Sequence, residues 1–363
     1  MKVLVGLSGG VDSSVAALLL QGAGHEVGAL FMKNWEEDDA SGACPAEADA
    51  EDARRVARQL GIPFFGRNFA AEYWDGVFAV FLAELKAGRT PNPDILCNRE
   101  VKFRTFVEHA LDLGYERVAT GHYAQLRRRE GQIELLRGAD PGKDQSYFLH
   151  ALDQAQLAVA EFPVGHLHKS EVRHIATEAR LPTHAKRDST GICFIGERAF
   201  DSFVARYLAP KPGPMRTPEG ETIGEHRGLQ FHTIGQRGGL GIGGRRGGSG
   251  EPWFVAAKSA SDNTLWVVQG EHPALYGTRL RSEAIHWIAG TPPAAAFTCS
   301  ARIRYRQQDQ TCRVRVLDGG SADVVFDQRQ RAITPGQSVV FYAGEVCLGG
   351  GIIAASDAFL GGL

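Results

Sequence analysis

Hydrophobic and polar positions in the first part of the chain follow two different periods. Short apolar runs at residues 3–7, 27–31, 63–65 and 117–120 predict β-strands. Between these runs, apolar side chains recur every three or four positions, as on one face of a helix. Three of these helical stretches end at a glycine: Gly61, Gly88 and Gly114. Because strands and helices alternate, the pattern predicts βαβ units and an α/β fold with a parallel sheet.

The pattern changes after about residue 200, where the helical spacing fades. Prolines punctuate residues 210–214, and residues 235–250 are dense in glycine, which indicates a small loop-rich middle domain. From Trp253 onward, short alternating runs separated by turns predict a C-terminal β-barrel. We therefore predict three domains, at residues 1–200, 201–275 and 276–363.

Composition narrows the class of protein. A chain of 363 residues with 43% hydrophobic and 23% charged residues has an ordinary globular balance, which argues against disorder. A formal net charge of −2 argues against blanket attraction to nucleic acid, so an RNA partner would need local basic patches. Neither a leader pattern nor an apolar run of membrane-spanning length is evident, so we expect no membrane attachment and a cytoplasmic location.

The six cysteines include no C-x-x-C pair, which disfavours a zinc ribbon, and we predict no protein metal centre. Cys299, Cys312 and Cys347 lie in strand-like runs, where a cysteine is usually a small buried hydrophobe. Two other cysteines, Cys97 and Cys193, lie in irregular loops.

The most informative stretch is S-G-G-V-D-S-S at residues 8–14, between the first strand and the first helix. Gly9 and Gly10 allow main-chain N–H groups to surround a phosphate, and the start of the helix adds the positive end of its dipole. Nearby serine hydroxyls are further donors. Asp12 is either the N-cap of the helix or a ligand for a phosphate-bound Mg²⁺. A purely structural turn remains the alternative for a glycine pair alone.

The same stretch excludes two common nucleotide motifs. No Gly-Lys-Ser/Thr follows, so it is not a Walker A loop, and it is not G-x-G-x-x-G, which disfavours hydride chemistry. Ligands of parallel sheets lie beyond the carboxyl ends of the strands, where Ser8, Met32 and Gly121 fall. The string resembles the PP-loop of ATP pyrophosphatases, which implies cleavage of ATP between the α and β phosphates and transfer of AMP to a substrate oxygen.

The first loop cysteine follows two prolines. Pro91 and Pro93 flank Asn92, which excludes a regular helix at the start of this segment. If the chain turns helical after Pro93, Asp94 and Cys97 share one face, and a carboxylate lies beside a thiol as an acid or base. An ordinary cap and a buried cysteine would explain this loop equally well.

Cys193 lies between a polar, glycine-containing approach and an apolar exit, with Lys186 and Arg187 nearby to favour its thiolate. A thiolate can carry a terminal sulfur or attack another sulfur. Two loop cysteines in a domain that activates a substrate with ATP suggest sulfur transfer.

Five strings then identify a family: residues 6–13, 90–97, 120–123, 143–146 and 191–196. Together they resemble the tRNA-specific 2-thiouridylases over the whole chain. The resemblance implies a PP-loop ATP pyrophosphatase (adenine nucleotide alpha hydrolase-like) domain. It also implies thiolation at C2 of the wobble uridine 34 in tRNA, with ATP adenylating the C2 oxygen and releasing pyrophosphate.

The resemblance also implies roles for particular residues. Cys193 would carry a persulfide from a sulfur carrier protein or a cysteine desulfurase. Cys97 would attack that persulfide or the activated base, a Cys97–Cys193 disulfide would close the cycle, and Asp94 would act as general acid or base. ATP, with Mg²⁺, would be bound by Gly6, Leu7, Ser8, Gly9, Gly10, Val11, Asp12, Ser13, Met32 and Gly121.

The substrate implied by the resemblance is tRNA of the Lys, Glu and Gln isoacceptors. Its contacts would be Asn92, Pro93, Asp94, His122, Lys143, Asp144, Gln145, Arg304, Tyr305 and Gln337, with the first three around a target base flipped from its stack. Strict alternation at Arg302, Arg304 and Arg306 would add a cationic face on one strand, although a merely solvated face is an equal alternative.

Three alternatives remain open from the sequence. The first is a PP-loop synthetase that adenylates its substrate and lets an amine displace AMP, which would not need the two cysteines. The second is a non-catalytic RNA-binding protein with a decayed nucleotide fold. The third keeps the reaction but places an iron–sulfur cluster on Asp94, Cys97 and Cys193.

Overall fold

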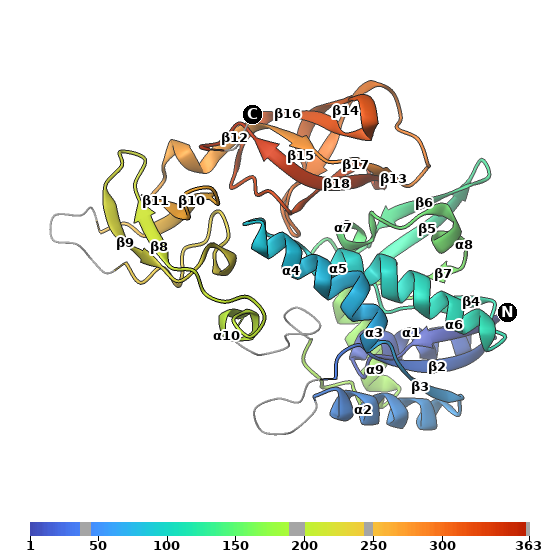
Figure 1. The fold of residues 1–363 in the computed structure, drawn as a ribbon. Helices are drawn as coiled ribbons and strands as arrows, with labels where there is room; N and C mark the ends of the chain where they lie inside the picture. Colours follow the sequence, from blue (N-terminus) through green and yellow to red (C-terminus); the bar gives the residue numbers. More distant parts are fainter. Residues whose placement is uncertain (37–44, 189–199, 243–249, 361–363) are drawn as a thin grey trace.

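The computed structural model describes residues 1–36, 45–188, 200–242 and 250–360 (Figure 1). Its first sheet has five strands in the order β3-β2-β1-β4-β7, and every neighbouring pair is parallel. The strands are β1 (Lys2–Gly6), β2 (Glu26–Lys33), β3 (Phe64–Asn68), β4 (Arg117–Ala119) and β7 (Ala160–Glu161). The predicted parallel α/β sheet is therefore confirmed, and its first four strands are the four apolar runs of the sequence.

Helices cover this sheet and connect its strands (Figure 1). The α-helices are α1 (Val11–Gly22), α2 (Pro45–Leu60), α3 (Ala70–Tyr73), α4 (Ala79–Lys86), α5 (Pro93–Leu96), α6 (Phe106–Asp112), α7 (Ser146–Leu149), α8 (Gln154–Ala158), α9 (Lys169–Glu178) and α10 (Phe200–Val204). Two π-helical segments, η1 (Trp74–Phe78) and η2 (Cys97–Thr105), join α3 to α4 and α5 to α6. Phe78 of η1 and Phe81 of α4 are buried in the core, whereas Trp74 at the start of η1 is 42% exposed. None of the helices in the described ranges has the length and hydropathy needed to cross a bilayer.

The middle of the chain forms a four-stranded sheet in the order β10-β11-β8-β9. Its strands are β8 (Gly213–Arg216), β9 (Thr222–His226), β10 (Trp253–Ser259) and β11 (Thr264–Gln269), and the short 3₁₀ turn η3 (Leu229–Phe231) lies between β9 and β10. Few residues here are in regular elements, which confirms a small, loop-rich middle domain.

The C-terminal part is an antiparallel barrel, because β12 pairs with both β16 and β18 and so closes a ring through β15, β14 and β17. The elements are η4 (Pro273–Leu275), β12 (Tyr276–Ser282), β13 (His286–Trp287), β14 (Ala296–Arg302), β15 (Gln310–Val316), η5 (Asp318–Gly320), β16 (Ala322–Arg331), β17 (Ser338–Ala343) and β18 (Val346–Ser356). The predicted barrel is confirmed. Its cysteines are strand residues as expected, with Cys312 and Cys347 buried and Cys299 half-buried opposite Cys312.

One hairpin from the first part of the chain pairs with the C-terminal barrel and not with the parallel sheet. The hairpin of β5 (Ala124–Arg129) and β6 (Gln132–Arg137) lies early in the chain but pairs with the barrel through β18. A single hydrophobic cluster accordingly runs from Leu4 in the parallel sheet through Leu135 in this hairpin to Tyr342 in the barrel. The parallel sheet and the barrel therefore share one core.

Candidate active site

The loop between β1 and α1 has the geometry of an anion cradle. Gly9 adopts φ 74°, and a Cβ there would lie 2.3 Å from the main-chain oxygen of Asp49, so only glycine fits. The N-cap of α1 is Gly10, which supplies no side-chain hydrogen bond to the first turn. The N–H groups of that turn therefore lack the usual side-chain acceptor and suit a phosphate.

The serines around this loop divide into two groups. The hydroxyls of Ser8 and Ser13 lie 3.1 Å apart; Ser8 is exposed, whereas Ser13 is buried and its hydroxyl also donates to the Gly10 carbonyl at 3.2 Å. Ser14 is fully buried, donates to the carbonyl of Gly10 at 2.8 Å and accepts from Thr183 Oγ1 at 3.0 Å. The expectation that Ser14 donates to the ligand is therefore wrong, because its hydroxyl supports the helix start from behind.

Asp12 is not the N-cap, because α1 begins at Val11 and is capped by Gly10. Its carboxylate lies in the first turn and accepts from Tyr123 Oη at 2.8 Å and from Lys169 Nζ at 2.7 and 2.8 Å. Burial and the neighbouring Asp12 raise the pKa of Tyr123, so its phenol stays protonated and donates. The N-cap role predicted for Asp12 is therefore wrong, and its carboxylate is paired with Lys169 and Tyr123 instead.

The other predicted nucleotide residues gather at the same edge of the sheet. A Cβ on Gly121, just after β4, would lie 2.7 Å from the main-chain nitrogen of Ser13. A Cβ on Gly6, the last residue of β1, would lie 3.1 Å from Met32 Cε. Behind the loop, buried Leu7 donates its N–H to β2, and Val11 packs inward. The structure thus brings together every residue assigned to ATP from the sequence.

A cluster of charges beside the cradle was missed by the sequence reasoning. Asp188 accepts from Lys143 at 2.5 Å, from Lys169 at 2.8 Å and from Arg173 at 2.7 Å. Burial alone would raise the pKa of Asp188, but the hydrogen bonds from Lys143 and Lys169 lower it to about 2. One signal was available: Lys169 opens α9, where the helix dipole disfavours a cation.

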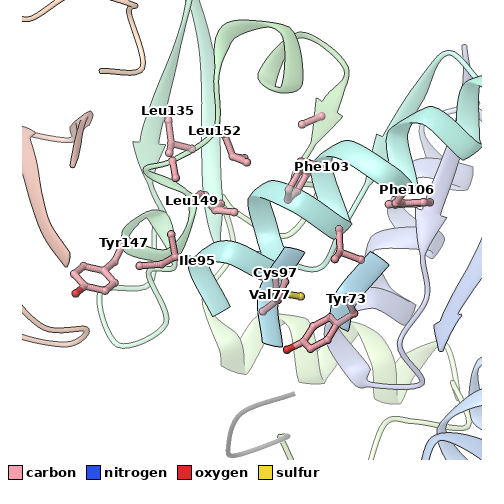
Figure 2. Packing of buried hydrophobic residues seen from close by; sticks show 14 of the residues in the cluster. Tyr73, Val77, Ile95, Cys97, Phe103, Phe106, Leu135, Tyr147, Leu149 and Leu152 are labelled. Atoms are coloured by element: carbon pink, nitrogen blue, oxygen red, sulfur yellow. The ribbon is translucent and has the colours of Figure 1, made fainter. Parts of the chain in front are cut away.

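The first cysteine loop folds as expected. Asn92 caps α5 by accepting from the Asp94 N–H at 3.2 Å, Pro93 is the first helical residue, and Cys97 follows in helical conformation. Asp94 and Cys97 are therefore one helical turn apart. Cys97 is buried beside Val77 and Tyr73 (Figure 2). Met32 packs against the same extended core cluster.

The second cysteine, Cys193, lies outside the described residues, as does Cys44. Lys186, expected to favour the Cys193 thiolate, pairs with Asp49 at 2.7 Å and Asp52 at 2.6 Å, both in α2. Its positive charge is therefore already matched by two carboxylates.

The residues assigned to tRNA near the sheet edge are partly buried. His122 is 8% exposed, bonds to Thr120 Oγ1 at 2.7 Å, and has its pKa lowered well below the usual value by burial. Asp144 is 3% exposed and accepts from Arg302 at 2.9 Å. Gln145 is half-buried and accepts from the Tyr123 N–H. His122 and Asp144 therefore lie beneath the surface, and Gln145 is only partly exposed on it.

The expected cationic strand face is wrong. β14 ends at Arg302, and Arg306 adopts φ 64°, so the three arginines do not alternate along one strand. Arg304 turns inward, and its Nη2 donates to the Ile234 carbonyl at 2.8 Å and to Thr334 Oγ1 at 2.7 Å. Next to it, half-buried Tyr305 packs on Phe148 with ring centroids 4.4 Å apart.

Thr90, two residues before Asn92, is held by both of the other domains. From the barrel, Gln337 Nε2 donates to the Thr90 carbonyl at 2.8 Å, and the Thr90 N–H donates to Pro335 at 3.0 Å. From the middle domain, Lys258 Nζ donates to Thr90 Oγ1 at 3.1 Å. The loop that carries Asn92 and Asp94 is therefore positioned by all three parts of the chain.

Comparisons with known proteins match the chain along its length. A family model described as tRNA methyl transferase HUP domain matches residues 1–197, one described as tRNA methyl transferase PRC-barrel domain matches 201–269, and one described as Aminomethyltransferase beta-barrel domain matches 277–353. The chain is 58% identical to the tRNA-specific 2-thiouridylase MnmA of Xanthomonas euvesicatoria, over 98% of this chain and 94% of that one. It is 55% identical to the enzyme of the same name from Nitrosococcus oceani, over 98% of both chains.

Proposed function

The chain belongs to the tRNA-specific 2-thiouridylase family, and from this premise we propose how its own residues carry out the reaction. It is an ATP-using tRNA-uridine 2-sulfurtransferase, and near full-length identity of 55–58% to enzymes of that name is the observation that carries this conclusion. The gathering of the ATP-assigned residues at one sheet edge supports it independently of the comparisons.

The first step activates the wobble uridine. We place the phosphates of ATP on the N–H groups of residues 9–13, with the hydroxyls of Ser8 and Ser13 as further donors. The C2 oxygen of uridine attacks the α-phosphorus, pyrophosphate leaves, and AMP becomes the leaving group at C2. Asp12 offers a carboxylate oxygen that suits Mg²⁺, which would neutralise phosphate charge when bound. Lys169, which pairs with both Asp12 and Asp188, lies at the same place and would exchange a carboxylate for a phosphate oxygen when ATP binds.

The second step delivers the sulfur. Cys193 holds a persulfide, received from a sulfur carrier protein or a cysteine desulfurase, and its terminal sulfur is transferred to C2 as AMP leaves. In one route the Cys97 thiolate attacks the Cys193 sulfur of the persulfide and releases hydrosulfide, which displaces AMP at C2. In the other route the terminal persulfide sulfur displaces AMP itself, and Cys97 then attacks the Cys193 sulfur of the Cys193–S–S–C2 adduct and releases 2-thiouridine. Both routes leave a Cys97–Cys193 disulfide to be reduced by an external dithiol. Asp94, one helical turn from Cys97, takes the proton from the Cys97 thiol before it attacks and returns it afterwards. Because Cys97 is buried, its thiol is protected from solvent between turnovers.

The tRNA contacts are proposed from the placement of the side chains. Asn92, Pro93 and Asp94 surround the flipped target base on the loop that all three domains hold. Lys143, Gln145, Tyr305 and Gln337 are half-buried and within reach of RNA, whereas His122, Asp144 and Arg304 act by shaping the surface beneath. We further propose that the Lys, Glu and Gln isoacceptors are the substrates and that the enzyme works in the cytoplasm without membrane attachment.

Serine substitutions test the sulfur chemistry. With tRNA, ATP and a persulfide donor, Cys97→Ser and Cys193→Ser should form no 2-thiouridine by mass analysis of the wobble nucleoside, while still binding ATP. Cys299→Ser, at a strand cysteine far from the loop in sequence, is the matched control and should retain activity. Formation of 2-thiouridine by both loop variants would show that the two thiols do not carry the sulfur, and a wild-type product that carries an amine in place of sulfur would favour the amide-forming synthetase. Absence of tRNA-dependent pyrophosphate release by the wild type would favour a non-catalytic RNA-binding protein, and iron with sulfide in anaerobic preparations would favour a cluster.

A further inference from the structure

Two cysteines face each other across neighbouring strands of the barrel wall. Cys299 of β14 and Cys312 of β15 are directly opposite in the antiparallel register, and their Sγ atoms lie 3.8 Å apart. Both are free thiols. The reaction described above uses neither of them, so sulfur transfer to tRNA does not explain why they meet.

The backbone is already spaced for a disulfide between these two residues. Directly opposed residues of antiparallel strands have Cα atoms about 4.5 or 5.5 Å apart. Disulfides join residues whose Cα atoms are about 4.4–6.8 Å apart, so either kind of opposed pair is within range. The sulfurs would have to approach to about 2 Å, which calls for side-chain rotation and not for a new strand register.

The two thiols differ in how an oxidant meets them. Cys312 is 0% exposed, whereas Cys299 is half-buried. The hydrogen bond with Cys299, together with burial, raises the pKa of the Cys312 thiol, so Cys312 keeps its proton. Oxidation of a cysteine depends on its thiolate character and its exposure. Cys299 is therefore the residue of the pair that an oxidant attacks first.

We propose that Cys299 and Cys312 form a reversible redox pair, in which a peroxide oxidises Cys299 and Cys312 converts the product into a disulfide. In the first step the Cys299 thiolate attacks one peroxide oxygen, the O–O bond breaks, hydroxide leaves, and Cys299 becomes a sulfenic acid. In the second step the Cys312 sulfur attacks the Cys299 sulfur and the S–O bond breaks. The Cys312 proton leaves with the hydroxyl group as water. A dithiol reduces the disulfide again.

The surroundings of Cys299 show what the second thiol prevents. Cys299 packs against the apolar cluster of the barrel, which includes Val314 and Phe341. Further oxidation would place a charged sulfinate against these side chains, which is costly and is not reversed by a dithiol. A disulfide is uncharged and would tie β14 to β15 at the base of the hairpin whose loop carries Arg304 and Tyr305. The inference goes beyond the proposed function, because it needs neither ATP nor tRNA.

The test treats the full-length protein with hydrogen peroxide, alkylates the remaining thiols and maps the cysteine peptides by mass spectrometry. In the wild type, a pair of peptides joined through Cys299 and Cys312 should appear, and it should be lost after treatment with dithiothreitol. Cys347 is the internal control, because it is a buried barrel cysteine whose register partner is Tyr342. Burial raises the pKa of Cys347 to about 12, and it should stay reduced.

Substitutions separate the two steps. Cys312→Ala removes the second thiol, so peroxide should convert Cys299 to sulfinic acid, and dithiothreitol should no longer restore the urea unfolding midpoint of the untreated protein. Cys312→Ser tests the same step if the alanine variant does not fold. In Cys299→Ser, Cys312 should stay reduced under the same treatment, because its thiol is fully buried.

Three results would overturn the inference. The first is that Cys299 and Cys312 both stay reduced at a peroxide dose that oxidises the other cysteines of the chain. The second is that wild-type Cys299 accumulates as sulfinic acid without forming the disulfide. The third is that Cys312 is oxidised in Cys299→Ser as readily as Cys299 is in the wild type, because the assigned order of attack would then be wrong.

Discussion

Lys258 is a lysine whose ammonium is enclosed at the junction of the domains. It lies in β10, and its Nζ is within hydrogen-bond distance of Thr90 Oγ1 and the His232 carbonyl, with the Arg89 carbonyl at 3.5 Å. Burial lowers the pKa of Lys258 from its ordinary 10.5 to about 7. Between pH 7 and 10.5 the Lys258 side chain is therefore protonated in the unfolded protein and largely neutral in the folded protein.

This difference makes the free energy of unfolding depend on pH in a known direction. Where the unfolded state binds more protons than the folded state, the free energy of unfolding rises with pH. The contribution of a neutral Lys258 to that free energy is therefore fully present above pH 10.5 and is lost as the pH falls to about 7. The full slope for one proton is about 1.4 kcal/mol per pH unit. Because the side chain as a whole is only half-buried, we expect about half of it, or roughly 1–1.5 kcal/mol between pH 7 and 9.

The assay is urea unfolding of the wild type and of Lys258→Met at pH 7, 8 and 9. Methionine fills the space without a titrating group, so the wild-type stability minus that of the variant should rise across the series. Lys86→Met, at an exposed lysine at the end of α4, is the matched control and should run parallel to the wild type. A difference between wild type and Lys258→Met that stays constant with pH would refute the reasoning.

Three further changes test the site and its support. Gly9→Ala adds about 1–2 kcal/mol of strain from the left-handed backbone and a clash with the main chain of Asp49, so tRNA-dependent pyrophosphate release should fall at least tenfold. Gly22→Ala has open space around the new methyl group and should leave pyrophosphate release unchanged. Lys169→Met should lower pyrophosphate release about 100-fold with unchanged tRNA binding, and equal loss of RNA affinity would argue against a nucleotide role. Arg304→Met leaves acceptors unpaired and should reduce the free energy of urea unfolding by about 2–3 kcal/mol; an unchanged value would show that its contacts are dispensable.

Local patterns along the sequence determined the elements and most of the site. The period of apolar positions predicts a strand or a helix because it reflects which face is buried, and that depends on near neighbours. Residues 8–13 and Gly121 follow β1 and β4, and Met32 lies near the end of β2, so the three meet at one edge once the sheet is parallel. The prolines around Asn92 likewise excluded a regular helix at the start of this segment, and the structure begins α5 at Pro93, because proline fixes its own backbone and suits the first helical position.

Tertiary structure alone decided which groups meet across long separations. Tyr123 and Lys169 reach Asp12 from 111 and 157 residues away, and no period in the sequence encodes such a contact. The sequence pattern around Arg304 indicates a solvated cation, yet the turn after β14 directs its guanidinium to the Ile234 carbonyl and the Thr334 hydroxyl. The β5–β6 hairpin pairs with β18 of the barrel, which lies more than 200 residues further along the chain. A local pattern cannot predict a partner at that separation. Sequence periodicity records burial, whereas partner identity depends on where the packed elements place each side chain.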